Sequence, residues 1–480
     1  MMHTVMKKLF SIILLSVVAL TARAHSPLDY LLQGEAMEHA SVGVYIMDID
    51  SREVVLSHNA HKAFVPASVV KLITAASVLQ CYDDTTRWST AAFLSGNVVD
   101  SVLHGDIVVR GSLDPSLGYE KAMAGCDDFV TSVAAGVQQA GIKRVSGSVI
   151  VDASRCDMGG WGEWMAEDLG LSYGSPCYGV NYRGNSFDLL LATDRQGSAP
   201  RILGTTVDMP MLHIGNHLTV GEKDSSAVYS LPYATECLLM GKLPAMRDTI
   251  TIACAMPDPP LVLAHELTTM LRRNGVCVDG EALTDRILKE RNIDLPQVDG
   301  LLYNRYSDPL QRMLREMLHD SNNLYAEAML RYVSLAHDSV ARTAPALAYE
   351  HAILGGMGLD TLSLHLADGS GLSRKNRVTP HFMANLLAQA YCTMGDSYRA
   401  LLPRAGKEGT VRSLFRRNPL PGELRLKSGS MSGVMCYAGY YSYKGRQYAI
   451  VLMSNHHSCK ASEMRSRYEK LLRAIPALAQ

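Results

Sequence analysis

The stretch from Pro66 to Thr74, "PASVVKLIT", is apolar and helix-like, except that Lys71 follows Ser68 by three residues. Residues at positions i and i+3 of a helix lie on one face, so the hydroxyl and the ammonium group can touch. A serine hydroxyl becomes a good nucleophile only when a base removes its proton. Burial disfavours the charged form of lysine, so an apolar surrounding makes Lys71 a suitable base. For this stretch alone, a lysine that extends its charge into solvent is the alternative.

Composition describes a globular protein with a substantial core. The chain has 480 residues, of which 47% are hydrophobic and 19% are charged. This length is sufficient for two or three domains. The formal net charge is -1, which gives no support to nucleic acid as a partner. Oligomeric state is not readable from these numbers.

The N-terminus resembles a secretory leader. Lys7 and Lys8 precede the apolar run Leu9 to Leu20, and a small-x-small pattern ends at Ala24. This arrangement predicts a signal peptide over residues 1–24, with an uncleaved anchor as the alternative. The mature protein is then exported and periplasmic, without a membrane span. Its ten cysteines permit disulfides, although their spacing predicts no pairing.

Short strand-like and helical runs outline the domains. Two strands are expected within residues 41–57, helices over about 310–318 and 324–335, and a terminal hairpin that turns at Lys444-Gly445 and leads into a helix. Between residues 82 and 296 the sequence consists mainly of short strand-like runs separated by Gly, Asp and Pro. We therefore expect a large β-rich insertion.

Two further stretches carry polar groups that can point into one cleft or hold a ligand. "HDSNNLY" places Ser321 and Asn323 at an interhelical turn, and "LRLKSGSMSG" places Lys427, Ser428 and Gly429 on a strand. A cation and a hydroxyl can hold a carboxylate, while glycine lets a ligand backbone lie close. Each pattern alone is also typical of an ordinary turn or edge strand.

In chain order, the three stretches resemble the S-x-x-K, S-x-N and K-[ST]-G motifs of penicillin-binding proteins and serine β-lactamases. The segment "ADGSGLSRKNRVTP", residues 367–380, resembles a stretch of the low-molecular-mass class C penicillin-binding proteins. These are the type 4 D-alanyl-D-alanine carboxypeptidase/endopeptidases of peptidase family S13. That family also has a long insertion between its first two motifs.

The resemblance implies an α+β fold, with a five-stranded antiparallel sheet between helices and a β-rich insertion. The implied divisions are a catalytic domain of residues 25–81 plus 297–480, an inserted domain of 82–178 plus 251–296, and a nested domain of 179–250. The implied substrates are peptidoglycan stem peptides and cross-links, and β-lactam antibiotics are the implied covalent inhibitors. No cofactor is implied, and the His456-His457 pair lacks a third ligand for a metal.

The resemblance also assigns roles to residues. Ser68 is the nucleophile, Lys71 the first-choice base, Ser321 a proton relay and Asn323 an orienting group. The backbone N–H groups of Ser68 and Ser430 would bind the oxyanion. Lys427, Ser428 and Gly429 would bind the terminal carboxylate of the peptide. In the family an arginine matching Arg374 contacts the diamino acid of the stem peptide, and Asp168 is a weaker match for its acidic partner.

Two other functions fit parts of the pattern. A serine β-lactamase of the class A type uses a glutamate in an E-x-x-L-N loop, but no Leu-Asn dipeptide occurs in this chain, and the class C type has tyrosine at the place of Ser321. A non-catalytic wall-binding relative would have kept the fold without the activity. The complete set of motif residues argues against such a relative.

Overall fold

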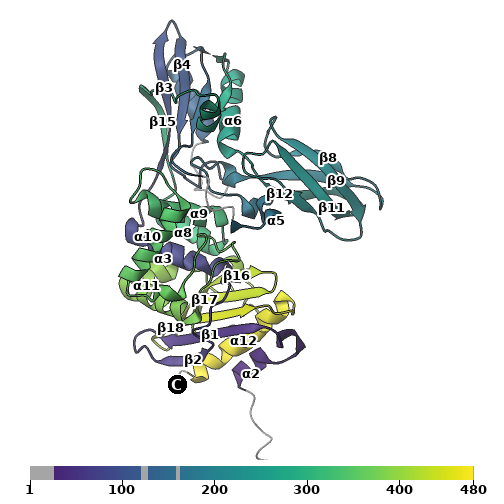
Figure 1. Ribbon diagram of the computed structural model, residues 1–480, viewed down its shortest axis with the longest axis vertical. Helices are drawn as coiled ribbons and strands as arrows, with labels where there is room; N and C mark the ends of the chain where they lie inside the picture. The colour runs from purple at the N-terminus through teal and green to yellow at the C-terminus, as the bar shows by residue number, and fades with distance from the viewer. Residues whose placement is uncertain (1–25, 120–127, 158–162, 479–480) are drawn as a thin grey trace, which may run out of the picture.

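The computed structural model describes residues 26–119, 128–157 and 163–478. The predicted signal peptide lies outside these residues. The molecule is elongated, with a part built from both ends of the chain at one end and a β-rich part at the other (Figure 1). No helix within the described ranges is long and apolar enough to cross a membrane.

A five-stranded antiparallel sheet joins the two ends of the chain. Its strand order is β16-β17-β18-β1-β2. The strands are β1 (Ser41–Asp48), β2 (Val54–His58), β16 (Glu423–Met431), β17 (Val434–Tyr443) and β18 (Arg446–Asn455). Lys444 and Gly445 connect β17 to β18 with positive φ angles of 48° and 79°. This conformation suits a tight hairpin between twisted strands, and the predicted turn is confirmed.

Helices cover both faces of this sheet, which confirms the predicted fold class. One face packs against α3 (Val70–Cys81), α8 (Leu310–His319), α9 (Asn323–Leu335) and α11 (Pro380–Ala400), and α10 (Thr343–Gly356) lies against α9. The other face packs against α2 (Pro27–Leu32) and α12 (Ala461–Leu478). Successive strand residues point to opposite faces, so Tyr440 enters the first core and Tyr441 the second.

The junction of α8 and α9 places the second motif. All five apolar residues that define the periodicity of α8 are buried, so the predicted helix is confirmed. The side chain of Asn322 accepts a hydrogen bond from the Tyr325 N–H at 3.2 Å and starts α9. Ser321 adopts a left-handed φ of 60° between the helices, which turns its side chain out of either helical register.

The inserted part contains a seven-stranded sheet. Its strands are β3 (Ser89–Val99), β4 (Val102–Arg110), β5 (Arg144–Val145), β6 (Val149–Asp152), β13 (Cys277–Val278), β14 (Ala282–Thr284) and β15 (Gly300–Tyr306). Helices α4 (Phe129–Gln139), α6 (Pro259–Arg273) and α7 (Asp285–Glu290) accompany it. Because β15 pairs with β3, we propose that the insertion continues to about residue 306, beyond the expected boundary at 296.

Two three-stranded sheets form the outer part of the insertion (Figure 1). One has the order β12-β7-β8 and the other β10-β11-β9. The strands are β7 (Ser186–Thr193), β8 (Arg201–Thr205), β9 (His213–Gly221), β10 (Ala227–Tyr229), β11 (Glu236–Pro244) and β12 (Arg247–Ala255). We propose that this pairing defines the nested domain, with limits near residues 186 and 255.

Candidate active site

Ser68 lies on the 3₁₀ turn η2 (Ala67–Val69), which leads directly into α3. Lys71, in the first turn of α3, is fully buried. Its Nζ donates to Ser68 Oγ at 3.0 Å, to Asn323 Oδ1 at 2.7 Å and to the Ser370 carbonyl at 2.6 Å. The expected contact between Ser68 and Lys71 is therefore present, and three acceptors hold the amine in place.

Burial changes the proton affinity of Lys71. It lowers the pKa of the ammonium group from 10.5 to about 7, while the carboxylates of Asp368 and Glu327 act in the opposite direction. The charged form loses its hydration in the apolar wall, and the two acids return part of that stabilisation. A lysine with this pKa is substantially neutral near pH 7 and can accept a proton from Ser68.

The S-x-N residues connect the two lysines of the site. Ser321 Oγ accepts from Lys427 Nζ at 2.9 Å. Asn323 uses its Oδ1 for Lys71, and its Nδ2 donates to the Tyr173 carbonyl at 2.8 Å. The amide of Asn323 thereby ties the lysine to a segment of the insertion.

Strand β16 brings the third motif against the turn that carries Ser68. Lys427 is buried, and both burial and the nearby Lys71 ammonium hold the pKa of Lys427 well below its usual value. A Cβ at Gly429 would lie 2.7 Å from the Pro66 carbonyl and 2.9 Å from the Ser68 nitrogen. Only glycine allows this close approach. Ser428 Oγ lies 2.7 Å from the hydroxyl of Thr410, which belongs to η7 (Gly409–Val411).

A pocket of about 440 Å³ opens at Ser68. The lining takes Ser68 from the first motif, Ser321 and Asn323 from the second, and Ser430, Met431 and Ser432, which directly follow the third. The insertion contributes Asp168 and Tyr173, and the loop of residues 367–380 contributes Gly371, Leu372 and Arg374. Lys427, Ser428 and Gly429, the third motif itself, are not part of this lining, and they precede Ser430 on β16.

Arg374 and Asp168 line the same pocket, and each has another polar partner. Arg374 Nε contacts Met165 Sδ at 3.3 Å. Asp168, on α5 (Ala166–Leu169), accepts from the Tyr173 hydroxyl at 2.8 Å. Within the described residues, both line the pocket without forming an ion pair with each other.

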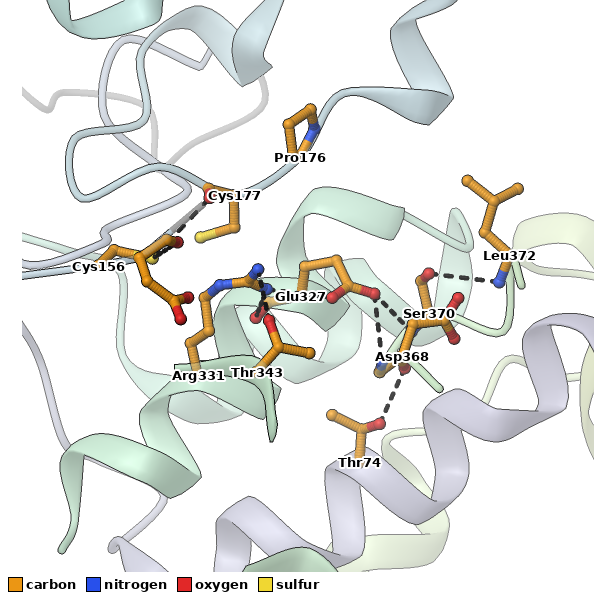
Figure 2. Close-up of polar contacts among 12 residues, drawn as sticks. Thr74, Cys156, Pro176, Cys177, Glu327, Arg331, Thr343, Asp368, Ser370 and Leu372 are labelled. Carbon is orange, nitrogen blue, oxygen red and sulfur yellow. Dashed lines mark hydrogen bonds and ion pairs between the residues drawn. The ribbon is translucent and has the colours of Figure 1, made fainter. Parts of the chain in front are cut away.

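Two buried carboxylates fix the loop of residues 367–380 beneath the site (Figure 2). Glu327 Oε1 accepts from the N–H groups of Gly369 and Ser370 at 3.1 and 3.0 Å, and Oε2 pairs with Arg331 at 3.1 Å. Asp368 accepts from the Gly371 N–H at 2.7 Å. The loop in turn presents the Ser370 carbonyl to Lys71, so Glu327 acts on the lysine through the loop.

Sequence reasoning missed four residues of this assembly: Glu327, Asp368, Tyr173 and Thr410. Glu327 lies four residues after Asn323, and this spacing places both side chains on one face of α9. The spacing could have indicated that Glu327 lies near the site. Asp368 stands in the quoted stretch, where nothing indicated its role. No local pattern marks Tyr173 or Thr410. Among the described residues no cluster of three or more potential metal ligands occurs.

The chain is similar to known proteins over most of its length. The chain is 27% identical to a D-alanyl-D-alanine carboxypeptidase of Actinomadura sp. over 90% of this chain and 80% of the relative. It is 26% identical to D-alanyl-D-alanine carboxypeptidase DacB of Haemophilus influenzae over 91% of this chain and 89% of the relative. The crystal structure of penicillin binding protein 4 from Haemophilus influenzae has the same fold, with a TM-score of 0.76 at 23% identity over 92% of this chain and 96% of that one. The family model of D-Ala-D-Ala carboxypeptidase 3 (S13) matches residues 24–475, and the chain belongs to this family.

Proposed function

We propose that the protein is a serine D-alanyl-D-alanine carboxypeptidase and endopeptidase that acts on peptidoglycan peptides through an acyl-enzyme on Ser68. The observation that carries this proposal is the buried amine of Lys71, held 3.0 Å from Ser68 Oγ by Asn323 and the Ser370 carbonyl. A neutral amine in this position is a base within reach of the nucleophile.

In the acylation step, Ser68 Oγ attacks the carbonyl of the penultimate D-Ala while Lys71 accepts its proton. The negative charge on the carbonyl oxygen lies between the N–H groups of Ser68 and Ser430. Donors of this kind are each worth about 3 kcal/mol in the transition state. The close packing of β16 on the Ser68 turn, made possible by Gly429, supports this placement.

The leaving D-Ala requires a proton on its amine. Ser321 donates its hydroxyl proton and regains one from a lysine, and Lys427 at 2.9 Å is the neighbour with the direct hydrogen bond. Water then attacks the ester and frees Ser68. The pKa of Lys71, lowered to about 7, allows this lysine to act as a base at neutral pH, and burial also lowers the pKa of Lys427.

The free carboxylate at the end of the peptide binds at Lys427 and Ser428, which accounts for selection of a C-terminal D-Ala. The hydroxyl of Thr410, 2.7 Å from Ser428 Oγ, orients that serine toward the ligand. Arg374 and Asp168 read the diamino acid side chain. A side chain that ends in an ammonium and a carboxylate, as in diaminopimelate, offers a partner to each.

The signal peptide directs the enzyme to the periplasm, where its substrate lies. A β-lactam resembles the D-Ala-D-Ala end of the peptide and acylates the same serine. The relatives' names, "penicillin binding protein 4" and "D-alanyl-D-alanine carboxypeptidase", support both the inhibitor and the substrate.

A fluorescent penicillin tests the proposal. The wild-type protein is expected to retain the label covalently and to release D-Ala from a stem pentapeptide, whereas Ser68→Ala is expected to do neither and to keep its melting temperature. Label retained by Ser68→Ala would disprove the assignment of the nucleophile. Loss of the label from wild-type enzyme within seconds would instead identify a β-lactamase.

A further inference from the structure

Cys156 and Cys177 lie beside each other in the interior, next to Arg331 (Figure 2). Cys156 Sγ lies 3.9 Å from the Cys177 carbonyl, and this is the one hydrogen bond that joins two cysteines in the described part of the chain. Both are free thiols, as are the other seven cysteines of the described residues. Cys177 is completely buried in the core around α3 and α9.

The backbones of both cysteines are fixed without help from their thiols. The peptide groups that flank Cys156 form two hydrogen bonds with Ala341, of 2.9 and 2.8 Å. Those that flank Cys177 bond to the side chains of Asn181 and Asn185, both at 2.9 Å. Cys156 Sγ already lies within 3.9 Å of the Cys177 carbonyl, and rotation about the two Cα–Cβ bonds moves the sulfurs relative to each other while the backbones stay in place.

We propose that Cys156 and Cys177 form a disulfide when the exported protein meets an oxidant. This inference rests on the export component of the proposed function, because disulfides persist in the periplasm and are reduced in the cytoplasm. The oxidant is itself a disulfide, either that of a thiol–disulfide oxidoreductase or glutathione disulfide. The two thiols lose two protons and two electrons, and the oxidant's disulfide becomes two thiols.

The surroundings assign the order of the two steps. The interaction with the Cys177 side chain and the positive charge of Arg331 lower the pKa of the Cys156 thiol, against the effect of burial. Burial holds the pKa of Cys177 well above its usual value. Cys156, the more exposed of the two, therefore attacks the oxidant as a thiolate and forms a mixed disulfide. Cys177 then gives up its proton, attacks the Cys156 sulfur and releases the second thiol of the oxidant.

The disulfide would close a loop that contains two residues of the substrate pocket. The segment between the two cysteines carries Asp168 and Tyr173, which line the pocket, and the Tyr173 carbonyl accepts from Asn323. Closing this loop of about 20 residues restricts the unfolded chain and stabilises the fold. We expect the oxidised enzyme to melt several degrees above the reduced enzyme.

Peptide mapping tests the inference directly. The protein is produced with its own leader, incubated with glutathione disulfide, denatured without reductant in N-ethylmaleimide and digested. We expect a peptide pair joined through Cys156 and Cys177. Alkylation of both residues after the oxidant treatment, or a bond from either one to a different cysteine, would overturn the inference.

Two variants separate this bond from other effects of reduction. Cys156→Ala is expected to abolish the difference in melting temperature between oxidised and reduced protein. Cys459→Ala, a partly buried cysteine whose sulfur contacts His457 and Met464, is the control that keeps it. An undiminished difference in Cys156→Ala would contradict the bond. Penicillin labelling of the same samples distinguishes the two proposals. Oxidant-treated protein that binds penicillin but keeps both thiols free would disprove only the disulfide. Cross-linked protein that binds no penicillin would disprove only the enzymatic activity.

Discussion

Burial lowers the pKa of Lys71, and the charge of Glu327 is expected to raise the pH at which Ser68 becomes reactive. With a pKa of about 7, Lys71 is protonated in acid and neutral in alkali. Its neutral fraction rises from about one tenth at pH 6 to about nine tenths at pH 8. Acylation at low penicillin concentration should therefore rise with pH through this range and then level off.

Glu327→Gln keeps the shape of the side chain and an oxygen that can accept from the Gly369 and Ser370 N–H groups, but it removes the negative charge. That charge raises the pKa of Lys71, so its loss should lower it. Removing a nearby unit charge from a site with an effective dielectric constant of about 20 changes the interaction energy by on the order of 2 kcal/mol. Arg331, 3.1 Å from the carboxylate, offsets much of this, so we expect the midpoint to move down by about half a pH unit to one unit.

The rate of labelling by a fluorescent penicillin, measured from pH 5 to 9, gives this midpoint. Glu463→Gln is a matched control, because Glu463 forms an i,i+4 ion pair with Arg467 on α12, away from the site. Its profile should equal that of the wild type. A Glu327→Gln enzyme that is slower at every pH with an unchanged midpoint would show that Glu327 only positions the loop. An upward movement would refute the electrostatic reasoning.

Three further predictions address binding and stability. Lys427→Ala should reduce kcat/KM by about 100-fold for a peptide with a free C-terminal carboxylate and far less for the corresponding amide, with little change in melting temperature. Equal reductions for the two peptides would contradict carboxylate binding. Arg374→Ala should lower kcat/KM for a diaminopimelate-containing pentapeptide by about tenfold or more and leave penicillin acylation almost unchanged; proportional losses would mean that Arg374 supports the catalytic frame. Glu350 is buried, both its oxygens lack hydrogen-bond partners in the described structure, and burial raises its pKa from 4.5 to about 8. Because the folded protein keeps this carboxyl group neutral, it loses stability as the pH rises from 4.5 to 8, by about 3 kcal/mol at pH 7. Glu350→Gln should therefore raise the melting temperature at pH 7.5 and leave it unchanged at pH 4.5. An equal gain at both pH values would refute this reasoning.

The sequence by itself determined the elements whose signal is local. The apolar spacing of residues 310–318 predicts α8, and the Lys444-Gly445 pair predicts the hairpin of β17 and β18, because helix periodicity and turn chemistry act over a few residues. The contact of Ser68 with Lys71 is also local, since one turn of chain fixes both. The order of the three motifs indicated the family before any geometry was known.

Only the tertiary structure decided what surrounds these residues. Lys71 owes its lowered pKa to burial, and burial is produced by helices and strands far away in the chain. The hydrogen bonds of Asn323 and of the Ser370 carbonyl to Lys71, and the approach of Gly429 to Ser68, join segments that no sequence pattern links. Chain packing sets such distances, and the solvation of a charge depends on all the atoms around it, so neither can be read from a neighbouring residue.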